Sequence, residues 1–81
     1  MIREKGKGRF EVDALIRIED FNEFFETQYL DEDFDTLGGM IINKLGKFPK
    51  KGERLSINTL TFKILGSDSR RLKLIEVRAI E

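Results

Sequence analysis

Residues 31–51 read DEDFDTLGGMIINKLGKFPKK, and both ends of this stretch carry the signals of a helix end. The acids at its start suit the positive N-terminal end of a helix, and Asp31 or Asp33 can provide the capping side chain. Gly46 is a natural C-terminal stop, and Pro49 prevents the helix from continuing. The stretch therefore predicts a central helix that begins near Asp31 and ends at Gly46.

The apolar residues of this stretch recur at spacings of three and four, which is typical of a helix with one buried face. They are Phe34, Leu37, Ile41 and Leu45. Gly38 and Gly39 each cost about 1 kcal/mol relative to alanine in a helix interior. A helix tolerates such a pair where another element packs closely against it. We therefore expect a close-packing contact at these glycines and not a phosphate-binding loop.

A strand and a shorter helix are expected before the central helix. Residues 10–18 largely alternate between apolar and polar side chains, the pattern of a strand with one buried face. Asp20 and Glu23 have the spacing of a capping box at the start of the short helix. Three phenylalanines then share one helical face and are expected in the core: Phe21, Phe24 and Phe25.

A hairpin is expected after the central helix. Residues 54–57 and 60–64 each alternate between polar and apolar side chains, and Asn58 and Thr59 separate them. A hairpin with its tip at these two residues puts the apolar side chains of both strands on one face.

A last strand is expected over residues 71–80, after a turn at residues 66–70. Its apolar phase changes between Leu74 and Ile75, which indicates a bulge or burial of both faces. The predicted order is β-α-α-β-β-β. An α+β fold with two helices packed on one face of a mostly antiparallel sheet is the economical arrangement.

Residues 1–9 are expected to be a flexible linker, and residues 10–81 the folded domain. Lys or Arg occupies every odd position from Arg3 to Arg9, and glycines interrupt the run. A basic arm that binds phosphate groups is the alternative interpretation.

The composition excludes several classes of function, and we do not expect an enzyme. The 81 residues contain no Cys and no His, which removes disulfides, thiolate sites and the commonest general base and zinc ligand. No apolar run approaches the roughly 20 residues that cross a bilayer, and the first residues do not form a secretory signal. The expected location is therefore the cytoplasm. Fifteen acids balance fifteen bases, which argues against a nucleic-acid partner.

The charges are nevertheless segregated along the chain. Residues 19–35 hold eight acids and no base, and residues 36–54 hold five bases and one acid. Three of these acids, Asp31, Asp33 and Asp35, are the candidate metal ligands, because Mg²⁺ and Ca²⁺ prefer carboxylate oxygens. Charge complementarity with the helix N-terminus explains the same acids without a metal.

Arg70 and Arg71 are the candidate cofactor-binding residues. A pair of arginines can hold a phosphate or carboxylate through bidentate hydrogen bonds. The alternative is a solvated turn in which the side chain of Asp68 bonds its own backbone.

Several segments together resemble the transporter-associated domain of the CorC/HlyC family, and are most similar to its CorC branch. They are F-x-V-x-A at 10–14, IEDFNE at 18–23, DTLGGMI at 35–41, LGKFPKKGE at 45–53, FKIL-x-x-DSRR at 62–71, and VR at 77–78. They follow one another in the family's order over nearly the whole chain.

The resemblance implies a non-catalytic accessory domain at the C-terminal end of a larger cytoplasmic protein, behind a pair of CBS domains. The CorC branch is linked to magnesium and cobalt efflux. The implied role is regulation through protein–protein contacts at the inner face of the membrane. The implied partners are the upstream CBS domains, a second copy as a homodimer, and a membrane transporter.

The family fold is related to a subdomain of FAD-binding domains, although no resident cofactor is expected. The alternative function is a small ligand-binding module. In that case FAD or an adenine nucleotide would bind near the N-terminus of the central helix and the turn at Arg70 and Arg71. A divalent cation is a further ligand of this hypothesis.

Overall fold

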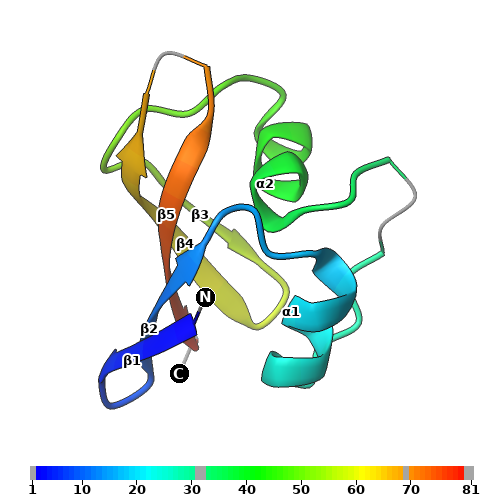
Figure 1. The fold of residues 1–81 in the computed structure, drawn as a ribbon, viewed down its shortest axis with the longest axis vertical. Helices are drawn as coiled ribbons and strands as arrows, with labels where there is room; N and C mark the ends of the chain where they lie inside the picture. Colours follow the sequence, from blue (N-terminus) through cyan, green and yellow to red (C-terminus); the bar gives the residue numbers. More distant parts are fainter. Residues whose placement is uncertain (1, 31–32, 69, 80–81) are drawn as a thin grey trace.

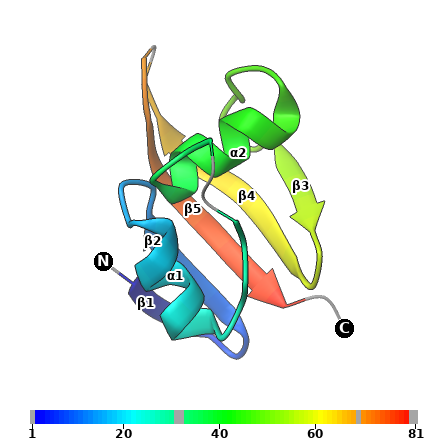
Figure 2. The same ribbon diagram turned by 90° about the vertical axis from the view of Figure 1, so that its right-hand side faces the viewer.

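The chain forms two layers, a sheet and a pair of helices. The computed structural model describes residues 2–30, 33–68 and 70–79. The elements are β1 (Ile2–Gly6), β2 (Arg9–Asp13), α1 (Ile18–Phe25), α2 (Leu37–Leu45), β3 (Arg54–Ile57), β4 (Leu60–Ser67) and β5 (Leu72–Ala79). The strands pair antiparallel in the order β1-β2-β5-β4-β3. Both helices lie on one face of this sheet (Figures 1 and 2).

The predicted α+β class is therefore confirmed, with one additional strand at the start. The core fills the space between the sheet and the helices, and its fully buried side chains include Val12, Phe21, Leu37, Phe62 and Val77. Within the described ranges, no helix is long and apolar enough to cross a membrane.

The expected flexible linker over residues 1–9 is wrong for Ile2–Gly6, which forms β1. This edge strand pairs with β2, where Ile2 lies opposite Val12 and Arg3 lies opposite Glu11. An edge strand needs only part of one face buried, so β1 can carry charged side chains at most of its positions. It therefore lacks the apolar alternation by which a strand is recognised in the sequence. Charged residues on an edge also oppose pairing with other chains.

Strand β2 is shorter than the strand predicted over residues 10–18, because the chain turns at Asp13. The Oδ1 atom of Asp13 accepts a hydrogen bond from the Leu15 N–H at 2.8 Å. The Asp13 carbonyl accepts another from the Ile16 N–H at 3.1 Å. Ala14 and Ile16 are still buried, so the apolar alternation identified the core residues correctly but overstated the length of the strand.

Helix α1 begins at Ile18, before the predicted capping box. Its N-cap residue is Arg17, which makes no side-chain cap hydrogen bond, so Asp20 and Glu23 lie within the helix. The Ile18 N–H instead donates to the Asp35 carbonyl at 2.9 Å. The prediction of three core phenylalanines holds for Phe21, which is fully buried, but Phe24 is 53% exposed.

Helix α2 begins later than the predicted central helix, because Thr36 is its cap. The Thr36 Oγ1 atom accepts a hydrogen bond from the Gly39 N–H at 3.1 Å. Asp33 therefore does not cap the helix, and Asp31 lies outside the described residues. The predicted C-terminal stop is confirmed, since Gly46 has a φ of 72° in the left-handed region that glycine favours.

The predicted close contact of another element with the glycine pair is confirmed at Gly38. A Cβ atom added to Gly38 would lie 3.2 Å from the Ala14 carbonyl oxygen and 3.6 Å from the Leu72 Cβ. The Gly38 N–H donates to that same Ala14 carbonyl at 2.9 Å. The missing side chain therefore lets the first turn of α2 rest directly on the chain that leaves β2.

The β3–β4 hairpin has the predicted tip, and Asn58 there adopts a positive φ of 58°. Between β4 and β5 the register changes from Ile64 opposite Ile75 to Gly66 opposite Leu74. The next pair, Ser67 opposite Leu72, leaves Lys73 as an extra residue on β5. This second irregularity accounts for the phase change predicted near Leu74, because it lets Leu72 and Ile75 both be buried.

Candidate functional site

The face of the sheet that points away from the helices carries polar and charged side chains. Along each strand they alternate with the buried core residues, as neighbouring side chains of a strand point to opposite faces. The strand register brings together Arg9, Glu11, Arg54, Ser56, Thr61, Lys63, Glu76 and Arg78. We call this surface the open face.

Like charges lie directly opposite one another at several positions on the open face. These cross-strand pairs are Arg9 with Arg78, Glu11 with Glu76, and Arg54 with Lys63. Such pairs destabilise a sheet unless groups of the opposite charge lie close to them.

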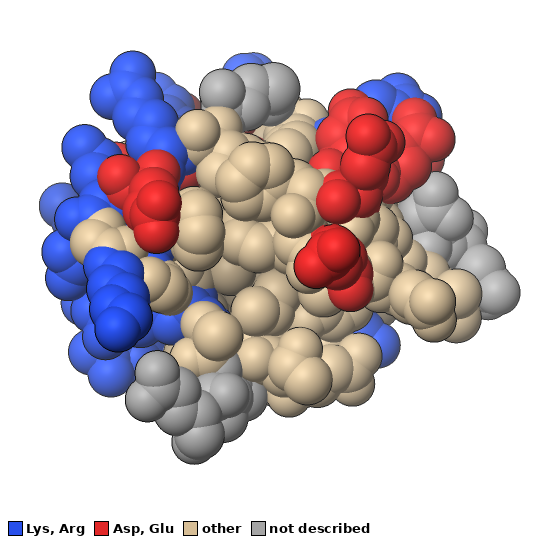
Figure 3. All heavy atoms as spheres, turned by 90° about the horizontal axis from the view of Figure 1, so that it is seen from below, with Lys and Arg blue, Asp and Glu red and all other residues tan. Residues whose placement is uncertain are grey.

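The acids of the open face neutralise only part of its positive charge. Glu76 Oε1 accepts a hydrogen bond from Arg78 Nε at 2.9 Å, and Lys5 Nζ lies 4.0 Å from Glu11 Oε1. Within the described part of the chain, no ion pair shorter than 4.0 Å involves Arg9. Figure 3 shows the result, with Lys and Arg gathered on the side of the sheet and acids on the side of the helices.

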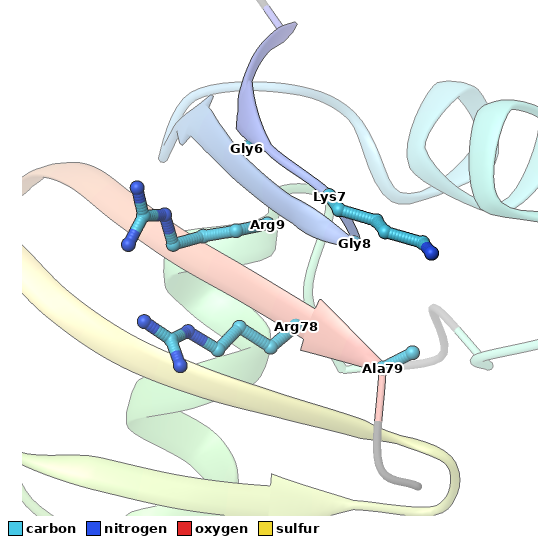
Figure 4. Close-up of a pocket in the computed structure, with 6 residues that line it drawn as sticks. All are labelled: Gly6, Lys7, Gly8, Arg9, Arg78 and Ala79. Atoms are coloured by element: carbon cyan, nitrogen blue, oxygen red, sulfur yellow. The ribbon is translucent and has the colours of Figure 1, made fainter.

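A shallow hollow of about 510 Å³ lies at the end of the open face, between the β1–β2 turn and the end of β5. Its lining includes Gly6, Lys7, Arg9 and Arg78. The side chains of Arg9 and Arg78 extend in the same direction from neighbouring strands, whereas Lys7 extends the other way (Figure 4).

A second hollow, on the helical side, is mainly apolar. It measures about 450 Å³ and is lined by Ile2, Ile16 and Phe24, with Asp20 and Glu23 as its acidic members. Phe24 is half-exposed and packs edge-on against Phe10, with 5.8 Å between the ring centroids. We call this surface the Phe24 hollow.

A cleft of about 350 Å³ separates α2 from the β3–β4 hairpin, with Tyr29, Phe34 and Asn58 among its lining residues. The hydroxyl of Tyr29 donates to the Ile57 carbonyl at 2.7 Å, which ties the loop after α1 to the hairpin. Burial raises the pKa of the Tyr29 hydroxyl. Tyr29 therefore has a structural hydrogen bond at this cleft.

Arg70 and Arg71 lie exposed in the turn between β4 and β5, at the far end of β5 from Arg78 (Figure 1). Asp68 Oδ1 accepts hydrogen bonds from the N–H groups of both arginines at 2.9 Å. These bonds hold the pKa of the Asp68 carboxyl below its usual range. The turn thus has the backbone bonding of the solvated-turn interpretation, and both arginines are exposed.

The N-terminus of α2, the other half of the predicted nucleotide site, has its N–H groups occupied. Leu37 and Gly38 donate to the Ile16 and Ala14 carbonyls at 2.9 Å, and Gly39 donates to the Thr36 hydroxyl. A phosphate at this terminus would have to displace one of these bonds.

The candidate metal ligands fall on the loop that precedes α2. Asp33 and Asp35 are exposed, and Asp31 lies outside the described residues. Within the described ranges, no three carboxylates come close enough together to hold a metal ion.

Comparison with known proteins identifies the family. Residues 3–81 match the CorC/HlyC family, described as the transporter associated domain. The chain belongs to this family. The magnesium and cobalt efflux protein CorC of Pasteurella multocida is 44% identical to the chain over 71 residues, which are 88% of this chain and 24% of that protein. The chain thus spans about a quarter of the curated relatives that it matches.

Solved transporter associated domains share the fold. The CorC-associated region from Neisseria meningitidis has a TM-score of 0.95 and 37% identity, and the match covers 98% of both chains. A domain from a Xylella fastidiosa hemolysin, solved in complex with Mg²⁺ and Mn²⁺, has a TM-score of 0.89 over 99% of this chain and 98% of that one. Its identity is 22%, so the likeness shows the fold alone.

The sequence interpretation missed the basic open face and placed Arg9 in a linker. The signal was present in the strand alternation, because Arg9 and Arg78 occupy the phase opposite to Val12 and Val77. Finding it required the pairing of β2 with β5, and strands so far apart in sequence could pair in several ways.

Proposed function

We propose that this transporter associated domain is a non-catalytic accessory domain of a CorC-type magnesium and cobalt efflux protein. It regulates efflux through protein–protein contacts on the cytoplasmic side of the membrane. The observation that carries the proposal is the Phe24 hollow, where the half-exposed ring of Phe24 lies beside the partly buried Ile2 and two acids, Asp20 and Glu23. Exposed apolar surface with a polar rim is typical of protein–protein contact sites.

The partner proposed for the Phe24 hollow is the CBS pair of the same polypeptide. Ile2, the first residue that the structure describes, lines this hollow. A domain tethered there would be held at high effective concentration beside Phe24. A second copy of the chain and a membrane transporter are the other partners to be tested.

The test uses the isotopically labelled 81-residue chain, titrated with the CBS pair of its parent protein and followed by NMR. We expect resonance changes at Ile2, Ile16 and α1, and an affinity about tenfold lower for Phe24→Ala, as for an apolar residue central to an interface. Leu30→Ala is the matched control, because Leu30 is also an exposed apolar residue, at 70%, but lies outside the hollow. Equal binding by wild type and Phe24→Ala would contradict the proposal.

A ligand-binding module for FAD or an adenine nucleotide is the second candidate. The exposed guanidinium groups of Arg70 and Arg71 favour it, while the occupied N–H groups of α2 restrict any phosphate contact to the arginines. Calorimetric titration with FAD and ATP tests it. Binding that disappears in the Arg70→Gln, Arg71→Gln double variant would support the ligand-binding module. If neither FAD nor ATP produces a heat of binding, this second candidate is excluded.

A divalent cation on the loop before α2 is a third proposal, with Asp31, Asp33 and Asp35 as ligands. The family member from Xylella fastidiosa was solved with Mg²⁺ and Mn²⁺, and carboxylates suit both ions. Mn²⁺ should then broaden the NMR resonances of Asp33 and Asp35 selectively, and Asp33→Asn should weaken the effect. Broadening spread evenly over all acidic residues would contradict a defined site.

A further inference from the structure

We propose that Arg9 and Arg78 on the open face form a binding site for a phosphate group. The inference goes beyond the proposed regulatory function, since it concerns the opposite side of the molecule from the Phe24 hollow. It begins from the placement of two guanidinium groups side by side on paired strands (Figure 4). Such a like-charge pair is unfavourable by itself and becomes favourable when an anion lies between the two cations.

The structure holds Arg9 in position for this role. Its Nη2 atom donates to the Lys5 carbonyl at 3.4 Å. A Cβ atom added to Gly6 would lie 3.3 Å from the same nitrogen, so the glycine leaves room for the guanidinium group beside β1. The guanidinium group carries five N–H donors, so donors other than the one bonded to Lys5 remain for a ligand.

Arg78 is positioned from the other side. Its Nε atom donates to Glu76 at 2.9 Å, which leaves the terminal nitrogen atoms for a ligand. Arg78 lies opposite Thr61 in the register of β4 and β5, and the Thr61 hydroxyl lies 3.1 Å from that of Ser56. A hydroxyl pair therefore lies beside Arg78, on the side away from Arg9.

These donors fit a phosphate group better than a carboxylate or a nucleobase. Two guanidinium forks offer more hydrogen bonds than the two oxygens of one carboxylate accept, whereas a phosphate has three oxygens and a charge near −2 at neutral pH. The open-face set contains no aromatic side chain on which a base could stack. The group recognised is thus the phosphate itself, either in a soluble anion or in a lipid headgroup.

The experiment has two arms, which separate these sources. In the first, the labelled chain is titrated with inorganic phosphate and with pyrophosphate, and NMR follows the amides of Gly8, Arg9, Thr61 and Arg78. In the second, the chain is sedimented with phosphatidylcholine vesicles that contain or lack phosphatidic acid. We expect binding in at least one arm, weakened about tenfold in Arg9→Gln and in Arg78→Gln, and weakened by added NaCl.

Two matched controls remove the same charge elsewhere. Lys7→Gln changes a residue that lines the hollow but extends away from the guanidinium pair (Figure 4). Lys44→Gln changes an exposed lysine of α2, on the helical side of the molecule. Both should bind as the wild type does. The proposal is overturned if neither arm shows binding, or if the controls lose as much affinity as Arg9→Gln and Arg78→Gln. Both test substitutions relieve a repulsion, so the variants should fold, and their NMR spectra verify this.

Discussion

Single side chains fix the loops that join the elements, and Asp68 is a clear case. Its carboxylate accepts two backbone hydrogen bonds and lies 3.7 Å from Lys73 Nζ. These contacts favour the charged form in the folded state and so lower the pKa of Asp68. A carboxyl with a lowered folded pKa stabilises the protein above its unfolded pKa, and this contribution is lost as the pH falls through the folded pKa.

Asp68→Asn should therefore reduce the acid sensitivity of the fold. The Asn side-chain oxygen can accept the same two hydrogen bonds but does not titrate. Below the usual pKa range of Asp, the free energy of unfolding should fall less steeply for the variant than for the wild type. Urea denaturation at a series of pH values measures both profiles, and parallel profiles would refute this explanation.

Tyr29 connects the loop after α1 to strand β3 through one hydrogen bond. Tyr29→Phe removes the bond to the Ile57 carbonyl, so the free energy of unfolding should fall by about 1 kcal/mol at neutral pH. Because burial raises the pKa of Tyr29, the wild type should lose stability as the pH rises through that pKa, whereas the variant should not. Thermal denaturation at neutral and alkaline pH tests both statements. A variant as stable as the wild type at neutral pH would show that the bond contributes nothing.

At the level of elements, the close packing of α2 against the chain after β2 depends on Gly38. The Ala14 carbonyl that faces Gly38 is held by the Gly38 N–H, and the Ala14 N–H donates to Lys73 across the sheet at 3.0 Å. The Ala14 carbonyl therefore has little freedom to move away from a methyl group added at Gly38. At Gly39, an added Cβ would instead approach side-chain atoms of Phe34 and Thr36 at 3.1 and 3.3 Å.

Gly38→Ala should lower the free energy of unfolding by about 1 kcal/mol, because overpacking costs about 1–3 kcal/mol against about 1 kcal/mol of improved helix propensity. Gly39→Ala is the matched substitution and should cost a similar amount, since the Phe34 Cβ moves only with its own backbone and the Thr36 hydroxyl is held by the Gly39 N–H. Denaturant unfolding compares both variants with the wild type. A Gly38→Ala variant more stable than the wild type would mean that the contact is not tight.

How far the sequence predicts each element depends on what defines its ends. The β3–β4 hairpin and the stop at Gly46 follow from local turn chemistry, and both were correctly predicted. The start of α2 was not correctly predicted, because the acids near Asp33 are plausible caps. Only the isolated β-bridge between Arg17 and Thr36 shows that the chain stays extended up to Thr36. Strand β1 was missed because its pairing with β2, and not its own apolar content, makes it a strand.

At the scale of the whole molecule, the two layers give the domain two unlike surfaces. The helical side carries the Phe24 hollow with its acids, and the open face of the sheet carries the arginines and lysines. A chain with no net charge can thus present a basic surface to one partner and an acidic, partly apolar surface to another. The sequence predicted the segregation of charge, but the fold determines which residues share a surface.

We propose that this domain regulates a CorC-type efflux protein through contacts at the Phe24 hollow. The most direct measurement is the rate of Mg²⁺ efflux from cells whose parent protein carries the wild-type domain, Phe24→Ala or Leu30→Ala, at equal expression. We predict that Phe24→Ala changes the rate about fivefold or more, the lower range of a regulatory coupling, while Leu30→Ala leaves it unchanged. Equal rates for all three proteins would contradict the claim.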